Sequence, residues 1–235
     1  MKTLYIIPSL ISEGNKDLFF PPNNLTFIKN TEAFFVENLR TARRFLRYLD
    51  NTFPIDDKHF LELNKHYDNH DAVINLLKDN RYRTYGIISE AGYPGIADPG
   101  SFIVKKAHEL NIKVIPLTGP SSLFMALSSS GLNGQNFCFH GYLPVKSPAL
   151  FKKIKQLEID SKKHQKTQIF IETPYRNQAL FEMLTKTLQE DTLLCIACDI
   201  GSAREFIYTQ PVKNWKKQKV DIHKRPAVFL LQAGN

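Results

Sequence analysis

The sequence predicts an α/β protein built from two small domains. In the first half, short apolar runs that favour strands alternate with segments of helical periodicity, which is typical of a parallel sheet joined by crossover helices. Two loops rich in glycine and proline, residues 89–100 and 118–122, each follow an expected strand and precede an expected helix. The second loop and a shift in charge place the boundary near residue 118. We therefore expect domains over 1–118 and 119–235.

The expected strands are short apolar runs that end at polar or turn residues. In chain order they cover residues 4–7, 25–28, 33–36, 60–63, 85–89, 113–117, 137–141, 167–172, 193–199, 206–209 and 226–232. The late strands have short connections, and strand 206–209 is expected to pair with strand 193–199. The second half is therefore expected to contain a mixed sheet.

The expected helices are segments with apolar residues at helical spacing. They cover residues 38–49, 71–77, 101–110, 121–130, 149–157 and 177–188. Asp71 is expected to cap the second of these helices, and Gly131 is expected to end the fourth. Residues 10–24, which contain Gly14 and two prolines, are expected to form a loop.

The helix expected over 38–49 has a strongly cationic face. Arg40, Arg43, Arg44 and Arg47 recur at i, i+3, i+4 and i+7, so they share one side of the helix. Four cations on one face repel one another. An anionic partner for this face is therefore a reasonable hypothesis.

Charge is distributed unevenly between the two halves. The chain has a net charge of +8; residues 1–118 contain 15 basic and 14 acidic side chains, and residues 119–235 contain 16 and 9. The excess therefore lies in the second half, where lysines cluster at 152–155, 162–166 and 213–224. Such clustering favours a polyanionic partner, RNA before membrane, although an ordinary solvated surface would have the same composition.

The cysteines and the N-terminal residues indicate the cellular compartment of the protein. Three cysteines are an odd number, which argues against a disulfide framework, and the pair Cys195 and Cys198 lies inside an apolar run where burial is the expected role. The first residues read as a β-strand, without the long apolar core of a signal peptide, and no run approaches the roughly 20 apolar residues of a membrane span. We expect a soluble, cytoplasmic protein.

Four separated motifs resemble those of one superfamily. They are SEAGYPGIADPG at 89–100, PLTGPSSLFMALSSSGL at 116–132, FCFHGYLP at 137–144 and IFIETPYR at 169–176. In order and spacing they resemble the signatures of the tetrapyrrole-methylase-like superfamily, and most of all its ribosomal RNA small-subunit 2′-O-methyltransferase branch. The chain departs from that branch at several positions, which are Asn38, Leu39, Cys198, Gly201 and Ser202.

The resemblance implies a methyltransferase that uses S-adenosylmethionine (SAM). It also implies two α/β domains with SAM in the cleft between them, a homodimer, and small-subunit ribosomal RNA as substrate. The cofactor contacts that it implies lie mainly in the glycine-rich loops, and they are Pro8, Ala91, Gly92, Ile96, Ala97, Asp98, Ser121, Ser122, Ile171 and Ala227. Asp98 and Ser121 have an alternative role as helix caps.

Methyl transfer to a ribose hydroxyl benefits from a base that removes the proton. Glu37 and Arg40 match the branch motif and are candidates for catalysis, although they could form a simple i,i+3 ion pair instead. Glu90, inside the SAM loop, is a third candidate that could face the substrate.

Three residues of the later motifs also have two readings. His140 in the strand at 137–141 is more often structural than functional in such a position. Tyr175 and Arg176 could stack on a nucleotide or only cap the following helix.

Three hypotheses remain open at this point. The first is an RNA methyltransferase that acts on the small ribosomal subunit. The second keeps SAM but replaces RNA by a small molecule such as a tetrapyrrole. The third, motivated by the altered positions, is a SAM- or RNA-binding protein without catalytic activity.

Overall fold

The computed structural model describes residues 1–12, 19–63 and 69–234, and it confirms the α/β fold class. The chain divides into two compact units, Met1–Ser121 and Ser122–Asn235. The segment at which the sequence placed the domain boundary, residues 118–122, contains this division. Among the helices of the described residues, none has both the length and the apolarity that a membrane span requires.

The first unit contains a five-stranded sheet in the order β3-β2-β4-β1-β5. All four neighbouring pairs are parallel, as the sequence predicted. In chain order the strands are β1 (Thr3–Ile7), β2 (Ala33–Val36), β3 (His59–Glu62), β4 (Thr84–Ile88) and β5 (Lys113–Pro116). Because the strands are parallel, the segments that follow β1, β2 and β4 all leave from the same edge of the sheet.

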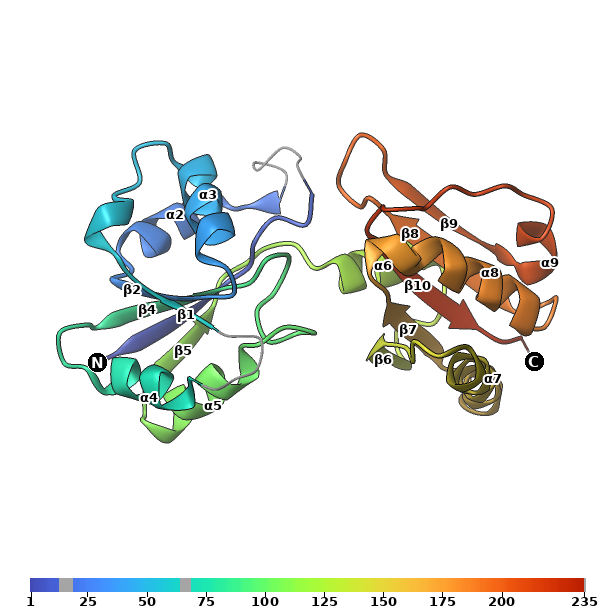
Figure 1. Ribbon diagram of the computed structural model, residues 1–235, viewed down its shortest axis with the longest axis horizontal. Helices are drawn as coiled ribbons and strands as arrows, with labels where there is room; N and C mark the ends of the chain where they lie inside the picture. Colours follow the sequence, from blue (N-terminus) through green and yellow to red (C-terminus); the bar gives the residue numbers. More distant parts are fainter. Residues whose placement is uncertain (13–18, 64–68, 235) are drawn as a thin grey trace. The chain divides into compact units, whose positions relative to one another are not determined.

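Helices cover both faces of this sheet. Figure 1 shows α2 (Pro22–Lys29) and α3 (Leu39–Leu49) on one face, and α4 (His70–Lys78) and α5 (Ser101–Glu109) on the other. Alternate residues of each strand point to opposite faces, and on β2 this separates Phe34 and Val36, which pack toward α2 and α3, from Ala33 and Phe35. Both faces of the sheet are therefore apolar. A short 3-10 helix, Ile55–Asp57, precedes β3.

Two local predictions in the first unit are wrong. The run 25–28, expected as a strand, lies in α2, whose first residue is Pro22. Proline suits the first helical position, and Asn24 and Ile28, one helical turn apart, are both buried. Asp71 does not cap α4, because the helix begins one residue earlier with Asn69 at its N-cap. The start of α2 at Pro22 also shortens the loop expected over residues 10–24, because residues 22–24 are helical. Residues 13–18 of that loop lie outside the described residues.

The second unit contains the mixed sheet that the sequence predicted. Its order is β6-β7-β10-β8-β9, in which only β6 and β7 are parallel and β8 pairs with β9 as expected. The strands are β6 (Phe137–Tyr142), β7 (Thr167–Ile171), β8 (Leu193–Cys198), β9 (Phe206–Pro211) and β10 (Ala227–Gln232). Cys195 and Cys198 are free and buried on β8, which confirms their expected burial, and this burial raises the pKa of both thiols.

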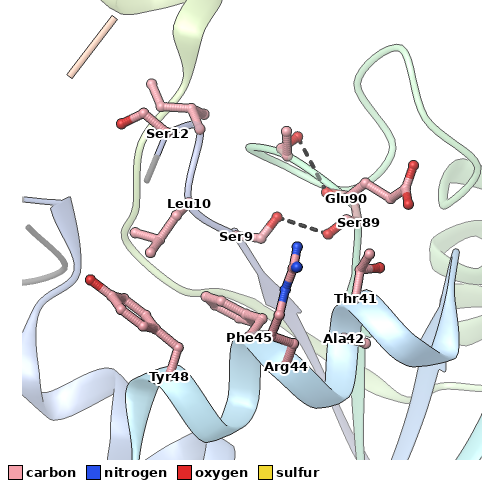
Figure 2. Close-up of a pocket in the computed structure, with 12 residues that line it drawn as sticks. Ser9, Leu10, Ser12, Thr41, Ala42, Arg44, Phe45, Tyr48, Ser89 and Glu90 are labelled. Carbon is pink, nitrogen blue, oxygen red and sulfur yellow. Dashed lines mark hydrogen bonds between the residues drawn. The ribbon is translucent and has the colours of Figure 1, made fainter. Parts of the chain in front are cut away.

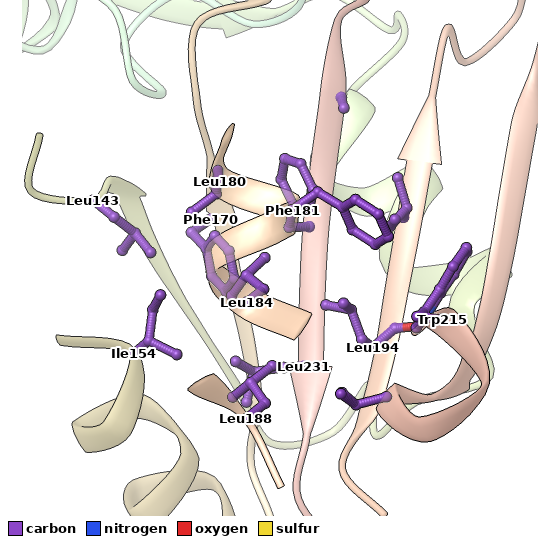
Figure 3. Packing of buried hydrophobic residues seen from close by; sticks show 14 of the residues in the cluster. Leu143, Ile154, Phe170, Leu180, Phe181, Leu184, Leu188, Leu194, Trp215 and Leu231 are labelled. Atoms are coloured by element: carbon purple, nitrogen blue, oxygen red, sulfur yellow. The ribbon is translucent and has the colours of Figure 1, made fainter. Parts of the chain in front are cut away.

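The core of the second unit lies between its sheet and a layer of helices. Those helices are α7 (Ser147–His164), α8 (Asn177–Thr187), preceded by the 3-10 turn Pro174–Arg176, and the short α9 (Val212–Trp215). Figure 3 shows Leu180, Phe181 and Leu184 of α8 within the cluster that also contains Phe170 and Leu194 of the sheet. The helix α6 (Ser122–Ser130) contacts β8, β9 and β10, and its buried residues lie outside that cluster.

The observed end points of two helices show what the sequence could define. Gly131, at φ +71°, directly follows α6, as predicted. The helix α7 extends to His164, beyond the predicted end at residue 157, and stops where Gln165 takes a left-handed conformation. Its last two turns carry mainly polar residues, which weaken the apolar periodicity without interrupting the helix.

Candidate functional site

Predicted site residues of the first unit gather at the edge where its parallel strands end. Pro8 follows β1, Glu37 follows β2, and Glu90 lies just beyond β4. The carboxyl ends of parallel strands are where ligands bind in open α/β sheets. The fold therefore places residues from distant parts of the sequence in the position that such a site requires.

Backbone pairing holds the loop at 89–100 against the segment that follows β1. The Ser9 N–H donates to the Gly92 carbonyl at 2.9 Å, and the Gly92 N–H donates to the Ser9 carbonyl at 3.2 Å. Gly92 has φ +70°, where glycine avoids the penalty that a side chain incurs. Ala97 takes φ +62° without that advantage, and such left-handed backbone costs roughly 1–2 kcal/mol.

Tyr93 joins this loop to the loop at 118–122. Its hydroxyl donates to the Leu117 carbonyl and accepts from the Gly119 N–H, each at 3.1 Å. Gly119 lies so close to Pro8 that an added Cβ would be 2.2 Å from the proline Cγ. The sequence did not single out Tyr93, since a tyrosine within a glycine-rich loop gives no local signal of a contact with residues 117–119.

Three carboxyl groups lie close together at this edge of the sheet. The Glu37 carboxylate accepts from the Glu90 N–H at 2.9 Å. Burial, followed by the negative charge of Glu37 and then of Glu90, raises the pKa of Asp98 to about 7, against the opposing effect of a hydrogen bond with Ser89. One of these carboxyl groups is therefore poised to change charge near neutral pH.

The structure decides between several alternatives that the sequence left open. Within the described residues, no ion pair joins Glu37 to Arg40; the Glu37 carboxylate binds the loop backbone instead. Asp98 does not cap α5, whose N-cap is Gly100 without a side-chain bond. Asn38, one of the positions that departs from the motif, caps α3 by accepting from the Thr41 N–H at 3.0 Å.

The residues of this edge fit the charge of SAM. The cofactor carries a positive sulfonium and an ammonium group, and the carboxyl groups of Glu37, Glu90 and Asp98 provide the complementary negative charge. Ala91, Ile96 and Ala97 are exposed, so this part of the loop is accessible to a ligand. The predicted contacts of the first unit therefore lie together and suit a cationic ligand.

The predicted contacts of the second unit lie on other elements. Ser122 begins α6, while Ile171 ends β7 and Ala227 begins β10. In the antiparallel register Ile171 pairs with Val228, which brings Ile171 next to Ala227. Ser121, the last residue of the first unit, precedes α6.

A buried ion pair fixes the segment that leads into Ala227. Arg225 Nε contacts the Asp199 carboxylate at 2.8 Å, and Arg204 contacts the same oxygen at 3.5 Å. The Arg225 guanidinium also donates to two backbone carbonyls at 2.8 Å. Asp199, which directly follows β8, therefore has a structural role in this unit.

The remaining sequence candidates separate into structural and exposed groups. His140 Nε2 lies 2.5 Å from Gln168 Oε1, and burial lowers the pKa of its imidazole, which supports the structural reading. Arg176 pairs with Glu172 at 3.0 Å. Tyr175 is 71% exposed, with the Lys224 ammonium 5.6 Å from its ring centre.

A cavity of about 550 Å³ opens in the first unit beside the same loop. Its walls are the segment 9–12 after β1, residues 89–91 after β4, and one side of α3 (Figure 2). On α3 it is lined by Thr41, Ala42, Arg44, Phe45 and Tyr48. The sequence singled out Arg44 only as one of four arginines and did not predict a cavity, because its three walls are distant in sequence.

The chain is similar to several known proteins that share one name. The chain is 34% identical to a ribosomal RNA small subunit methyltransferase I of Buchnera aphidicola subsp. Schizaphis graminum, over 98% of this chain and 78% of the relative. The proteins of the same name from Escherichia coli O157:H7 and Bacillus subtilis are 29% and 32% identical, over 97% and 80% of this chain. No family model matches the chain.

Two solved structures share the fold. The methyltransferase CobJ superposes with a TM-score of 0.62 at 12% identity, covering 100% of this chain and 95% of that protein. A conserved hypothetical protein from Aeropyrum pernix K1 gives a TM-score of 0.67 at 11% identity, covering 99% and 84%. These likenesses bear on the fold alone.

Proposed function

The chain belongs to the family of ribosomal RNA small subunit methyltransferase I, and from that membership we propose that it transfers a methyl group from SAM to a ribose 2′-hydroxyl of small-subunit ribosomal RNA. The observation that carries the proposal is 34% identity over 98% of the chain. The position of Glu37, Glu90 and the loop at one edge of the first sheet supports it.

The cofactor is proposed to bind through the two glycine-rich loops. When bound, SAM supplies an electrophilic methyl group on a positively charged sulfur. The residues proposed to hold it are Pro8, Ala91, Gly92, Ile96, Ala97, Asp98, Ser121, Ser122, Ile171 and Ala227. The exposure of Ala91 and Ala97, and the Asp98 carboxyl group, support this assignment in the first unit.

Glu37 is the proposed acceptor of the proton from the ribose hydroxyl. A hydroxyl is a weak nucleophile, so a carboxylate within hydrogen-bond reach promotes its attack. The Glu90 N–H holds one Glu37 oxygen at 2.9 Å, which orients the carboxylate at the end of β2. The Glu90 side chain and Arg40 are proposed to position the substrate next to it, and both are exposed.

The substrate proposal has support from charge. The net charge of +7 in residues 119–235 and the exposed lysines of α7, such as Lys152, Lys162 and Lys163, suit a phosphate backbone. The proposal includes a cytoplasmic location, because the substrate is ribosomal RNA, and a homodimer, on the family resemblance.

The test is transfer of a labelled methyl group from SAM to small ribosomal subunits from a strain that lacks this gene. We expect label in the ribose of small-subunit RNA. Glu37→Gln should reduce kcat, measured at saturating SAM, by about 100-fold or more. Glu62→Gln is the matched control, because Glu62 ends β3 beside β2 and is exposed.

Two results would contradict the proposal. Absence of label with SAM still bound in a calorimeter would favour a small-molecule substrate or a protein without catalytic activity. Equal activity of wild type and Glu37→Gln would remove Glu37 from the proton transfer while the substrate assignment stood.

A further inference from the structure

The cavity beside α3 adjoins the proposed cofactor loop without coinciding with it. Only Ala91 belongs both to its lining and to the proposed cofactor contacts. Methyl transfer requires the acceptor to lie directly next to the donor. A cavity that touches the loop at its first residues, 89–91, and extends away from it has the position that an acceptor needs.

The volume of this cavity suits one nucleotide. Ligand pockets in proteins span about 300–1,000 Å³, and this one is about 550 Å³. A whole RNA helix cannot enter a space of this size. An RNA substrate would place only its reacting nucleotide inside, unstacked from its neighbours.

The side chains on α3 provide the chemistry for a nucleotide. Phe45 and Tyr48 are one helical turn apart and line the cavity together with Arg44. Phe45 is anchored edge-to-face against Phe20, with ring centres 6.0 Å apart, whereas Tyr48 is 50% exposed. An exposed aromatic ring at the rim offers a face on which a base can stack.

Arg44 provides the positive charge that a phosphate group requires. Of the described residues that line the cavity, Arg44 alone is cationic, and no carboxylate among the described residues forms a salt bridge with it. In Figure 2 its guanidinium extends toward Ser9 and Ser89, while the Glu90 carboxylate points away from it. Its neighbour Arg43 instead pairs with Asp56 at 2.8 Å, so the arginines of α3 differ in function.

We infer that this cavity binds the nucleotide that receives the methyl group, with Tyr48 stacked on its base and Arg44 bound to its phosphate. The inference rests on the proposed RNA methyltransferase function and names the subsite for its substrate. The Ser9 hydroxyl donates a hydrogen bond to the Ser89 carbonyl at 2.8 Å. These two residues close the end of the cavity next to the loop.

The test compares Arg44→Ala and Tyr48→Ala with two controls in the full chain. Tyr48→Phe keeps the ring, and Lys78→Ala removes one exposed cation from α4, on the opposite face of the sheet. The readouts are kcat and KM for small subunits, SAM affinity by calorimetry, and binding of a mixed-sequence single-stranded RNA oligonucleotide by fluorescence anisotropy. Thermal melting checks that each variant is folded.

We expect KM to rise about tenfold or more in Arg44→Ala and Tyr48→Ala, with SAM affinity within about threefold of wild type. Both controls should stay within about threefold of wild type. Arg44→Ala should also reduce by about 1 the slope of log K against log salt for the oligonucleotide. An unchanged KM in both variants, or a loss of SAM affinity without an effect on RNA, would overturn the inference.

The experiment distinguishes a failure of the proposed methyltransferase function from a failure of the inferred nucleotide subsite. If the wild-type protein transfers no methyl group, the affinity for the oligonucleotide alone decides whether the cavity binds a nucleotide. A tenfold loss in Arg44→Ala and Tyr48→Ala supports the subsite, whereas equal affinity in all variants overturns it.

Discussion

Asp98 is expected to make the first unit less stable as the pH rises from about 4 to about 7. The pKa of its carboxyl group is about 7 in the folded chain and 3.8 in the ordinary case. Between these values the folded chain retains a proton that the unfolded chain has lost, so stability falls as pH rises from about 4 to about 7. Above pH 7 the full destabilisation caused by Asp98 is present.

The size of this effect follows from the pKa shift. A difference of 1 in pKa corresponds to 1.36 kcal/mol. The difference between about 7 and 3.8 therefore sets an upper bound of about 4 kcal/mol on the destabilisation. Because Asp98 is partly open to solvent, we expect about 2 kcal/mol. Asp98→Asn removes the charge and keeps an acceptor for Ser89. The variant should therefore gain about 2 kcal/mol at pH 8 and little at pH 4.5.

Urea unfolding at both pH values provides the assay. Far-UV circular dichroism follows both units, while Trp215, the one tryptophan of the sequence, reports on the second unit and serves as an internal control. Asp57→Asn, an exposed position in the first unit, controls for the loss of one charge. A stability change in Asp98→Asn that is the same at pH 4.5 and pH 8, or a loss at pH 8, would refute the reasoning.

Three further predictions concern the loops and the second core. Gly119→Ala would place a Cβ 2.2 Å from Pro8 Cγ, so the loop at 118–122 must move away from the segment after β1. SAM affinity measured by calorimetry should fall at least tenfold, and unchanged affinity would contradict the role of this contact. Glu158 is buried and accepts two hydrogen bonds of 2.7 Å from the segment between α8 and β8. Glu158→Ala should therefore destabilise the second unit by about 3 kcal/mol in urea titrations of Trp215 fluorescence; a change below about 1 kcal/mol would contradict this. Because a cationic ligand favours ionised Asp98, SAM should bind more tightly at pH 8 than at pH 6 in wild type, and with equal affinity in Asp98→Asn.

Local sequence signals predicted the elements where several of them agreed. The strand at residues 33–36 and the helix that follows were predicted nearly to the residue, because an apolar run and a clear helical periodicity indicate their boundaries. The run 25–28 was misassigned because four residues can satisfy either period. The start at Pro22 and burial of Ile28 against the sheet make it helical.

The sequence proposed residues for the site but not their arrangement. The motifs at 89–100 and 116–132 indicated the family, the cofactor and the loop residues, because such loops need particular residues at fixed spacing. Sequence reasoning proposed Glu37 and Arg40 for catalysis, with an i,i+3 ion pair between them as the alternative. The observed partner of Glu37, the Glu90 N–H, is 53 residues away in sequence.

By itself, the sequence determined the α/β class, the parallel and mixed sheets, the family and the charged second half. These properties follow from local periodicity, composition and contiguous motifs. Only the tertiary structure decided that Asp98 lies half-buried near Glu37 and Glu90, that Tyr93 joins two loops, and that α3 forms a cavity with segments after β1 and β4. The physical reason is that parallel strands bring the ends of distant segments to one edge of a sheet, where proximity depends on strand order rather than on separation along the chain.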